Sequence, residues 1–126
     1  MNQSKSIRRF SWRARLRSIK FAYDGIEAFF ASQHNAIIHF YFTLFVLLAA
    51  VFFKVSATEL VLLVVVAGFV WAAEIFNTAI ETMMDHLSPD EHPRVKYIKD
   101  LSAAAVLIAA VSAAITGLII FIPKLT

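Results

Sequence analysis

Four polar side chains follow the most apolar run of the sequence. The run LVLLVVVAGFV (60–70) leads into WAAEIFNTAIETMMD (71–85), which carries what we term the polar stripe: Glu74, Asn77, Glu81 and Asp85. On an α-helix these positions lie within about 80° of one another and span about 16 Å of its length. An ionised carboxylate inside a bilayer costs several kcal/mol unless it is paired, hydrated or bound to a metal. We interpret the stripe as functional; carboxylates paired with arginines for assembly are the alternative.

The residue types of the polar stripe suit phosphoryl transfer to an alcohol. A poorly hydrated carboxylate can act as a general base near neutral pH, and one nearer water can hold Mg²⁺ together with phosphate oxygens. Asn77 can hydrogen-bond a phosphate, while Lys99 and Asp100 stand just before the next apolar segment. A lysine and a metal ion together stabilise the charge of a phosphoryl group in transfer. These residues predict phosphorylation of a lipid hydroxyl by a soluble nucleotide.

The composition places this chemistry in an integral membrane protein. Of the 126 residues, 60% are hydrophobic and 17% are charged, and a soluble domain of this length could not bury so much apolar surface. Because the chain has no cysteine, disulfides and thiolate metal sites are excluded. None of its three glycines opens a P-loop, so the sequence does not indicate a kinase of a soluble fold.

Three apolar segments are expected to be membrane-spanning helices, at about 36–53, 60–84 and 101–122. The first has 18 residues. At about 1.5 Å per residue it is roughly 27 Å long, just enough to span a bilayer. Pro89 and Pro93 are expected to break the helix in the link 86–100. His39, near the start of the first segment, is expected to make one interhelical or headgroup hydrogen bond.

The N-terminal region, about 10–33, is expected to form an amphipathic helix in the membrane interface. Its apolar positions recur in steps of four and three along one face: Trp12, Leu16, Ile19, Tyr23, Ile26 and Phe30. The basic face suits anionic headgroups or a phosphorylated substrate; nucleic acid is disfavoured as a partner because an apolar body follows at once. Seven of the twelve basic residues precede position 21 and three lie in the 86–100 link, so the positive-inside rule predicts that both regions are cytoplasmic.

Small residues recur at every fourth position of the third apolar segment: Ala105, Ala109, Ala113 and Gly117. Such a face allows another helix to pack closely. Because three spans make a thin bundle, some of this packing is expected between the subunits of a homo-oligomer. Packing inside one subunit is the alternative.

The stretch AAEIFNTAIETMMD, followed by H and then by KDLSAAAVLIAA, resembles the prokaryotic diacylglycerol kinase family, which includes the undecaprenol kinases. The family core reads approximately E-x-x-N-[ST]-A-I-E-x-x-x-D, a short loop, and K-D-x-[GSA]-[SA]-A-A-V. This chain matches it at Glu74, Asn77, Thr78, Ala79, Ile80, Glu81, Asp85, Lys99 and Asp100. YDGIEAFFASQHNAIIH resembles the first-helix pattern of the undecaprenol-kinase branch, which slightly favours undecaprenol over diacylglycerol as the substrate.

The resemblance implies a single lipid-kinase domain over residues 1–126, an all-α membrane protein with an N-terminal amphipathic helix and three transmembrane helices. It also implies a homotrimeric bundle in the bacterial cytoplasmic (inner) membrane, with active sites shared between subunits, that uses Mg²⁺ and ATP to phosphorylate a lipid alcohol. By position, Glu74 matches the family's general base and Glu81 a metal-holding glutamate. The other matches surround the phosphates or lie in the loop that covers the nucleotide: Asn77, Lys99, Asp100, Asp90, Glu91 and His92.

One position departs from the family pattern. The family usually has a second metal-holding glutamate eight residues after the glycine matched by Gly25, and that position is Gln33 here. An amide oxygen binds Mg²⁺ more weakly than a carboxylate does. Glu27 cannot easily substitute for Gln33. It lies six residues earlier, which places it about 120° round the helix and roughly 9 Å away along the axis. Either Glu81, helped by Gln33, holds the metal with lower affinity, or the chain is a non-enzymatic or catalytically weakened subunit of the same fold.

Overall fold

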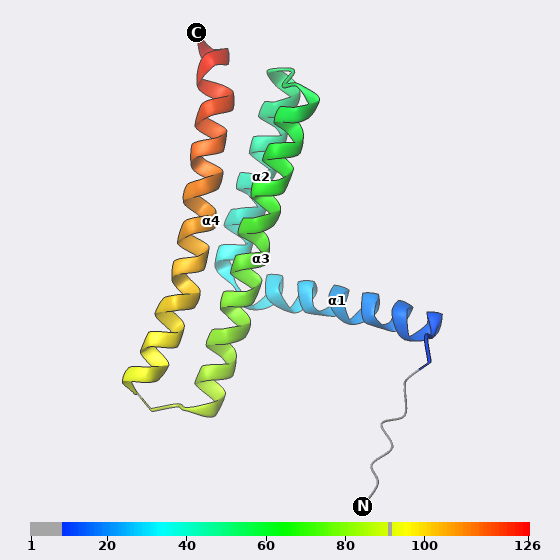
Figure 1. Cartoon of the computed structure of the whole chain (residues 1–126), viewed down its shortest axis with the longest axis vertical. Coiled ribbons are helices and arrows are strands. Elements are labelled where there is room, and N and C mark those ends of the chain that lie inside the picture. The colour runs from blue at the N-terminus through cyan, green and yellow to red at the C-terminus, as the bar shows by residue number, and fades with distance from the viewer. Residues whose placement is uncertain (1–8, 91) are drawn as a thin grey trace, which may run out of the picture. The chain divides into compact units, whose positions relative to one another are not determined.

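The computed structural model describes residues 9–90 and 92–126, and the secondary structure of this part is entirely helical. Its helices are α1 (Trp12–Ser32), α2 (His34–Phe52), α3 (Ala57–Leu87) and α4 (Pro93–Leu125). In length and composition, α2, α3 and α4 are each able to cross a membrane. In Figure 1 their colours run from cyan (α2) through green (α3) to yellow and red (α4). The predicted all-α fold with three candidate spans is therefore confirmed.

The chain divides into two compact units, one ending at His34 and one running from Asn35 to Thr126. The first contains α1, which begins where the Ser11 hydroxyl accepts a hydrogen bond from the backbone N–H of Ala14 at 3.4 Å. The helix ends at Gln33, whose extended backbone donates its N–H to the carbonyl of Phe29 at 3.0 Å. The predicted helix 10–33 is thus confirmed to within two residues at its start and one at its end.

In the second unit, α2 and α3 are joined by a tight turn after Phe52. Val55 N–H donates to the carbonyl of Ala50 at 3.1 Å, and Lys54 N–H donates to that of Val51 at 3.2 Å. This pair of bonds is a Schellman helix end, and Lys54 adopts the left-handed conformation it requires, with φ 50°. The next helix starts with a capping box in which Ser56 and Glu59 bond each other's backbone N–H at 3.1 and 2.8 Å.

The small core of the second unit lies beside this turn. Ala50 of α2, Leu63 of α3 and Ile120 of α4 form a buried cluster, and Val46, Val55 and Phe121 pack against it. Most other large apolar side chains are exposed. Exposed apolar side chains are what the lipid-facing surface of a membrane protein presents, because hydrocarbon is as apolar as the side chains themselves.

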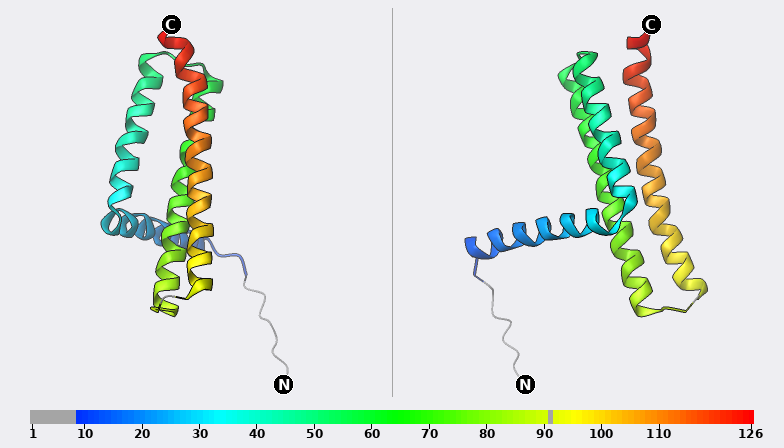
Figure 2. Two further views of the ribbon diagram at one scale, coloured as in Figure 1. Left: turned by 90° about the vertical axis from the view of Figure 1, so that its left-hand side faces the viewer. Right: turned by 180° about the vertical axis from the view of Figure 1, so that it is seen from behind.

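α3 and α4 run antiparallel and lie side by side (Figure 2). They have 31 and 33 residues. At about 1.5 Å per residue each is longer than 45 Å, which exceeds the roughly 30 Å hydrocarbon core of a bilayer. Their ends therefore reach water. The predicted helix break within 86–100 is confirmed, but the link is shorter than predicted: Pro89 lies in it, and Pro93 is already the first residue of α4.

Candidate active site

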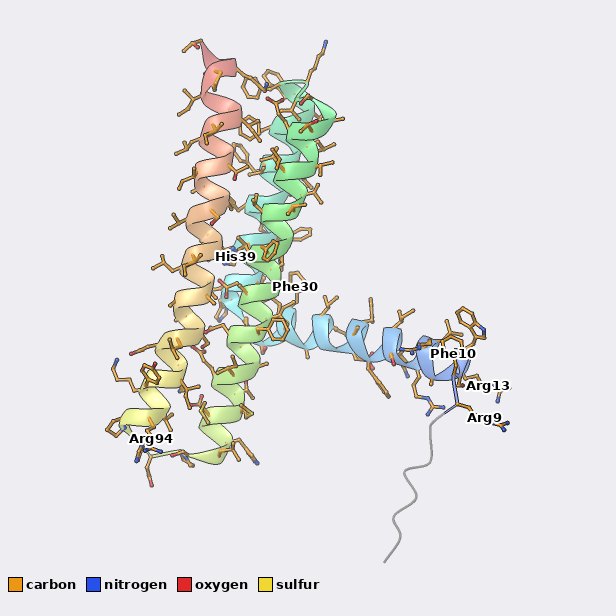
Figure 3. The ribbon with its side chains drawn as sticks, viewed as in Figure 1. Arg9, Phe10, Arg13, Phe30, His39 and Arg94 are labelled. Atoms are coloured by element: carbon orange, nitrogen blue, oxygen red, sulfur yellow. The ribbon has the colours of Figure 1, made fainter. Side chains whose placement is uncertain are left out.

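The polar stripe lies along α3 where α3 meets side chains of both neighbouring helices. Glu74 faces α2: its Oε1 atom is 2.8 Å from Nε2 of His39, and its side chain is only 12% exposed. The interhelical bond confirms one of the two alternatives predicted for His39, which Figure 3 labels on α2. The carboxylate interpreted as a general base is thus shielded from water, with one oxygen bound to an imidazole.

One turn further along α3, Asn77 faces α4. The Oγ atom of Ser102 lies 2.7 Å from Oδ1 of Asn77 and 2.9 Å from the backbone oxygen of Lys99. A hydroxyl has one proton to donate, so both contacts are satisfied together only if the Asn77 amide turns and donates to Ser102. Ser102 is buried. It therefore fixes the Asn77 side chain between the two helices.

Towards the α3–α4 link the stripe becomes part of a charged cluster. Asp85 and Lys99 form a hydrogen-bonded ion pair across the two helices, and the carboxylate of Glu81 also attracts the Lys99 ammonium group. Lys96 and Asp100 form a second pair within α4. The side chains of Asp85 and Lys99 are 66% and 34% exposed, so an incoming anion can reach both.

A hollow of about 630 Å³ lies beside this cluster, at the ends of α3 and α4. Five of the predicted site residues line it: Asp85, Asp90, His92, Lys99 and Asp100. This volume is within the range of about 300–1,000 Å³ typical of small-molecule sites. His92 has a structural task as well, because its Nδ1 atom accepts the backbone N–H of Arg94 at 3.1 Å and caps α4. Glu91, predicted beside these residues, lies outside the described part of the chain.

The predicted metal ligands come from different units. Gln33 closes α1 in the first unit, whereas Glu81 belongs to the second. Within residues 9–90 and 92–126, no three His, Asp or Glu side chains gather into a group able to hold a metal by themselves. Mg²⁺, however, commonly takes one or two carboxylates and fills its other positions with phosphate oxygens and water. Glu81, near the charged cluster, fits this partly protein-bound mode.

Two residues of the site were absent from the predicted set. Ser102 is the partner of Asn77, and its only sequence signal is that it is a lone hydroxyl early in the third apolar segment, three residues after Lys99. Thr43 of α2 accepts a hydrogen bond from Nε1 of Trp71 at 3.1 Å, which ties α2 to α3 one turn from His39. Neither pairing could be inferred without knowing which helix faces lie together.

The fold and the site define a helical membrane protein with a hollow lined by charged side chains at one end of its α3–α4 hairpin. Residues 20–121 match the family model described as prokaryotic diacylglycerol kinase. Over 125 residues the chain is 32% identical to a diacylglycerol kinase of Synechocystis sp., covering 96% of this chain and 71% of that protein. The chain belongs to the prokaryotic diacylglycerol kinase family.

Two further relatives carry two different substrate names. Over 80 residues the chain is 38% identical to an undecaprenol kinase of Bacillus subtilis, covering 64% of this chain and 65% of that protein. Over 78 residues it is 40% identical to a diacylglycerol kinase of Escherichia coli, covering 60% of this chain and 64% of that protein. Similarity to relatives of both names leaves the choice of lipid open.

Proposed function

We propose that this protein is a membrane lipid kinase that transfers the γ-phosphate of ATP to the primary hydroxyl of diacylglycerol or undecaprenol. The observation that carries the proposal is the series of polar side chains along α3. It runs from the water-accessible pair Asp85–Lys99, past Glu81 and Asn77, to the shielded Glu74. A soluble nucleotide can therefore bind at one end of the stripe, while a lipid hydroxyl reaches the other. The names of the relatives support a kinase over a non-enzymatic subunit.

The proposed chemical step uses Glu74 as the base. Because His39 occupies Oε1, Oε2 is the oxygen that takes the proton of the lipid hydroxyl. The hydroxyl oxygen bonds to the γ-phosphorus of ATP while the bond from phosphorus to the β–γ bridging oxygen breaks and ADP leaves. Asn77 lies about 4.5 Å further along the helix axis, one turn away, where its amide is placed to hydrogen-bond the phosphoryl group.

Lys99 stabilises the negative charge of the phosphoryl group in transfer. In the structure its ammonium group is paired with Asp85, so the nucleotide must compete for it. Ion pairs this exposed contribute little to stability, and a polyphosphate carries more negative charge than one carboxylate. The exchange of partner is therefore inexpensive. Asp100, Asp90, Glu91 and His92 are proposed to surround the rest of the nucleotide at the hollow.

The proposal includes Mg²⁺ bound with the nucleotide. Glu81 would hold it, helped by Gln33, and the ion would supply charge neutralisation on the phosphate oxygens. The carboxylate of Glu81 also attracts Lys99. Lys99 and a Mg²⁺ ion held by Glu81 would therefore lie close together, where both can contact the phosphates. Because Gln33 offers an amide where the family usually has a carboxylate, the affinity for the metal is expected to be low.

We also propose a homotrimer in the bacterial cytoplasmic membrane, with the N-terminus and the α3–α4 link in the cytoplasm. The distribution of arginine and lysine supports this orientation. The small-residue face of α4 supports the oligomer. A side chain added at Gly117 would meet no heavy atom within 4 Å, so close packing inside the chain does not require this glycine.

The proposal is tested by offering the purified protein labelled ATP together with diacylglycerol or undecaprenol in otherwise identical mixed micelles. The account expects label in the organic phase with at least one alcohol, and the first-helix pattern favours undecaprenol. An equal amount of label without added alcohol, or none with either alcohol, would contradict the proposed function.

A further inference from the structure

We propose that His39 is a positioning residue for Glu74: it fixes the orientation of the carboxylate that takes the substrate proton. The inference rests on the function proposed above, because His39 acts on the reaction only through the base. It assigns a task to the one ionisable side chain of α2 that meets the polar stripe.

The geometry of the contact is that of a strong hydrogen bond. Nε2 of His39 and Oε1 of Glu74 are 2.8 Å apart, and the two side chains are 28% and 12% exposed. A carboxylate bonded through one oxygen cannot rotate freely about its last torsion. The second oxygen, Oε2, is therefore held in one direction, as the acceptor of a proton in flight must be.

A second contact one turn away prevents the two helices from sliding past each other. Nε1 of Trp71 donates to Oγ1 of Thr43 at 3.1 Å. Thr43 follows His39 by four residues, and Trp71 precedes Glu74 by three, so both contacts belong to the same antiparallel register. The Trp71 ring also meets the His39 ring edge-on, with the ring centres 6.3 Å apart. The imidazole is thus supported independently of the carboxylate it binds.

Within the described residues, His39 is the sole side chain that forms a hydrogen bond or ion pair with Glu74. The other titratable groups on the packed helices lie elsewhere: Glu81 is about 10 Å further along the α3 axis, Lys99 of α4 has an ion pair of its own, and Tyr41 of α2 is largely exposed. His39 is therefore the side chain that orients the Glu74 carboxylate.

The proton balance of the step follows. A neutral imidazole with its proton on Nε2 donates to Oε1, and Oε2 takes the proton of the lipid hydroxyl as the new bond to phosphorus forms. Glu74 becomes neutral and His39 stays neutral throughout. Proton transfer thus begins from a carboxylate that is both ionised and oriented.

The test compares kcat, KM for ATP and Tm for variants of the full-length protein in mixed micelles. His39→Phe keeps a ring but removes the donor, and it should lower kcat by about 10- to 100-fold, since misplacing a reacting group by about 1 Å costs up to 10²-fold. KM for ATP should change little.

Two variants distinguish the positioning role of His39 from a purely structural role. His39→Gln places an amide N–H near the position of Nε2, so it should recover most of kcat. Thr43→Val removes the neighbouring interhelical bond, and it should lower Tm while lowering kcat much less than His39→Phe does. If His39→Phe does not fold, His39→Asn replaces it, because the shorter amide does not reach Glu74.

The outcomes distinguish this inference from the proposed function. Glu74→Gln combined with His39→Phe should be no slower than Glu74→Gln alone, because His39 acts through the base. A wild-type kcat in His39→Phe, or an equal loss of kcat in Thr43→Val or His39→Gln, would overturn the positioning role. If Glu74→Gln alone keeps the full rate, the proposed base is wrong and the positioning role is overturned with it.

Discussion

Replacing Lys99 by methionine separates the catalytic contribution of a lysine from its contribution to stability. The side chain is 34% exposed and its partner Asp85 is 66% exposed, so the ion pair adds little to folding. In Lys99→Met, Tm should fall by only a few degrees. Losing one electrostatic stabiliser of the transition state typically lowers kcat by about 10²–10³-fold. Because Lys99 borders an open hollow, where water screens its charge, we expect a loss near 10²-fold.

Lys124→Met is the matched control. Lys124 is also partly exposed, at 25%, and pairs with Glu59 at 3.1 Å across the opposite ends of α3 and α4. Its replacement should lower Tm about as much as Lys99→Met does, while leaving kcat unchanged. Phosphate transfer and thermal unfolding are measured on the same preparations. Equal activity losses in the two variants, or a kcat for Lys99→Met within a few-fold of wild type, would refute the reasoning.

Three further substitutions test separate parts of the account. Ser56→Ala removes half of the capping box with Glu59 and should lower stability by about 1 kcal/mol without changing kcat, as read from Tm and label transfer. Ser102→Ala frees the Asn77 amide and should slow transfer by about fivefold, which corresponds to the roughly 1 kcal/mol contributed by one hydrogen bond. An unchanged rate would mean that this bond does not orient the amide. Gln33→Glu should lower the Mg²⁺ concentration for half-maximal rate, and an unchanged magnesium titration would exclude Gln33 as a ligand.

The helices were predictable because the length of an apolar segment indicates a membrane span, and the periodicity of apolar residues indicates a helix face. The three apolar segments predicted α2, α3 and α4. The ends of the helices were harder to predict. An apolar segment ends at the first charged residues, whereas a helix ends where its backbone hydrogen bonds end. Pro93 ends the predicted break by beginning α4: it has no N–H to leave unpaired in the first turn, and His92 supplies the cap.

The site was predictable in its residue types and only partly in its contacts. A spacing of three and four residues predicts that the four members of the polar stripe share one side of α3. That spacing cannot tell which neighbour each member meets. Glu74 turns to His39 of α2, whereas Asn77 and Asp85 turn to Ser102 and Lys99 of α4. Those pairings depend on how three helices pack, which no periodicity within one helix records.

The most direct test of the central claim is a single-turnover measurement of label transfer from ATP to lipid, comparing wild-type protein with Glu74→Gln. The amide keeps the shape of the side chain and a contact to His39 but cannot take the substrate proton. The account predicts that Glu74→Gln binds ATP as the wild type does and transfers phosphate at least about 10²-fold more slowly, the usual contribution of a general base. Transfer at the wild-type rate would contradict it.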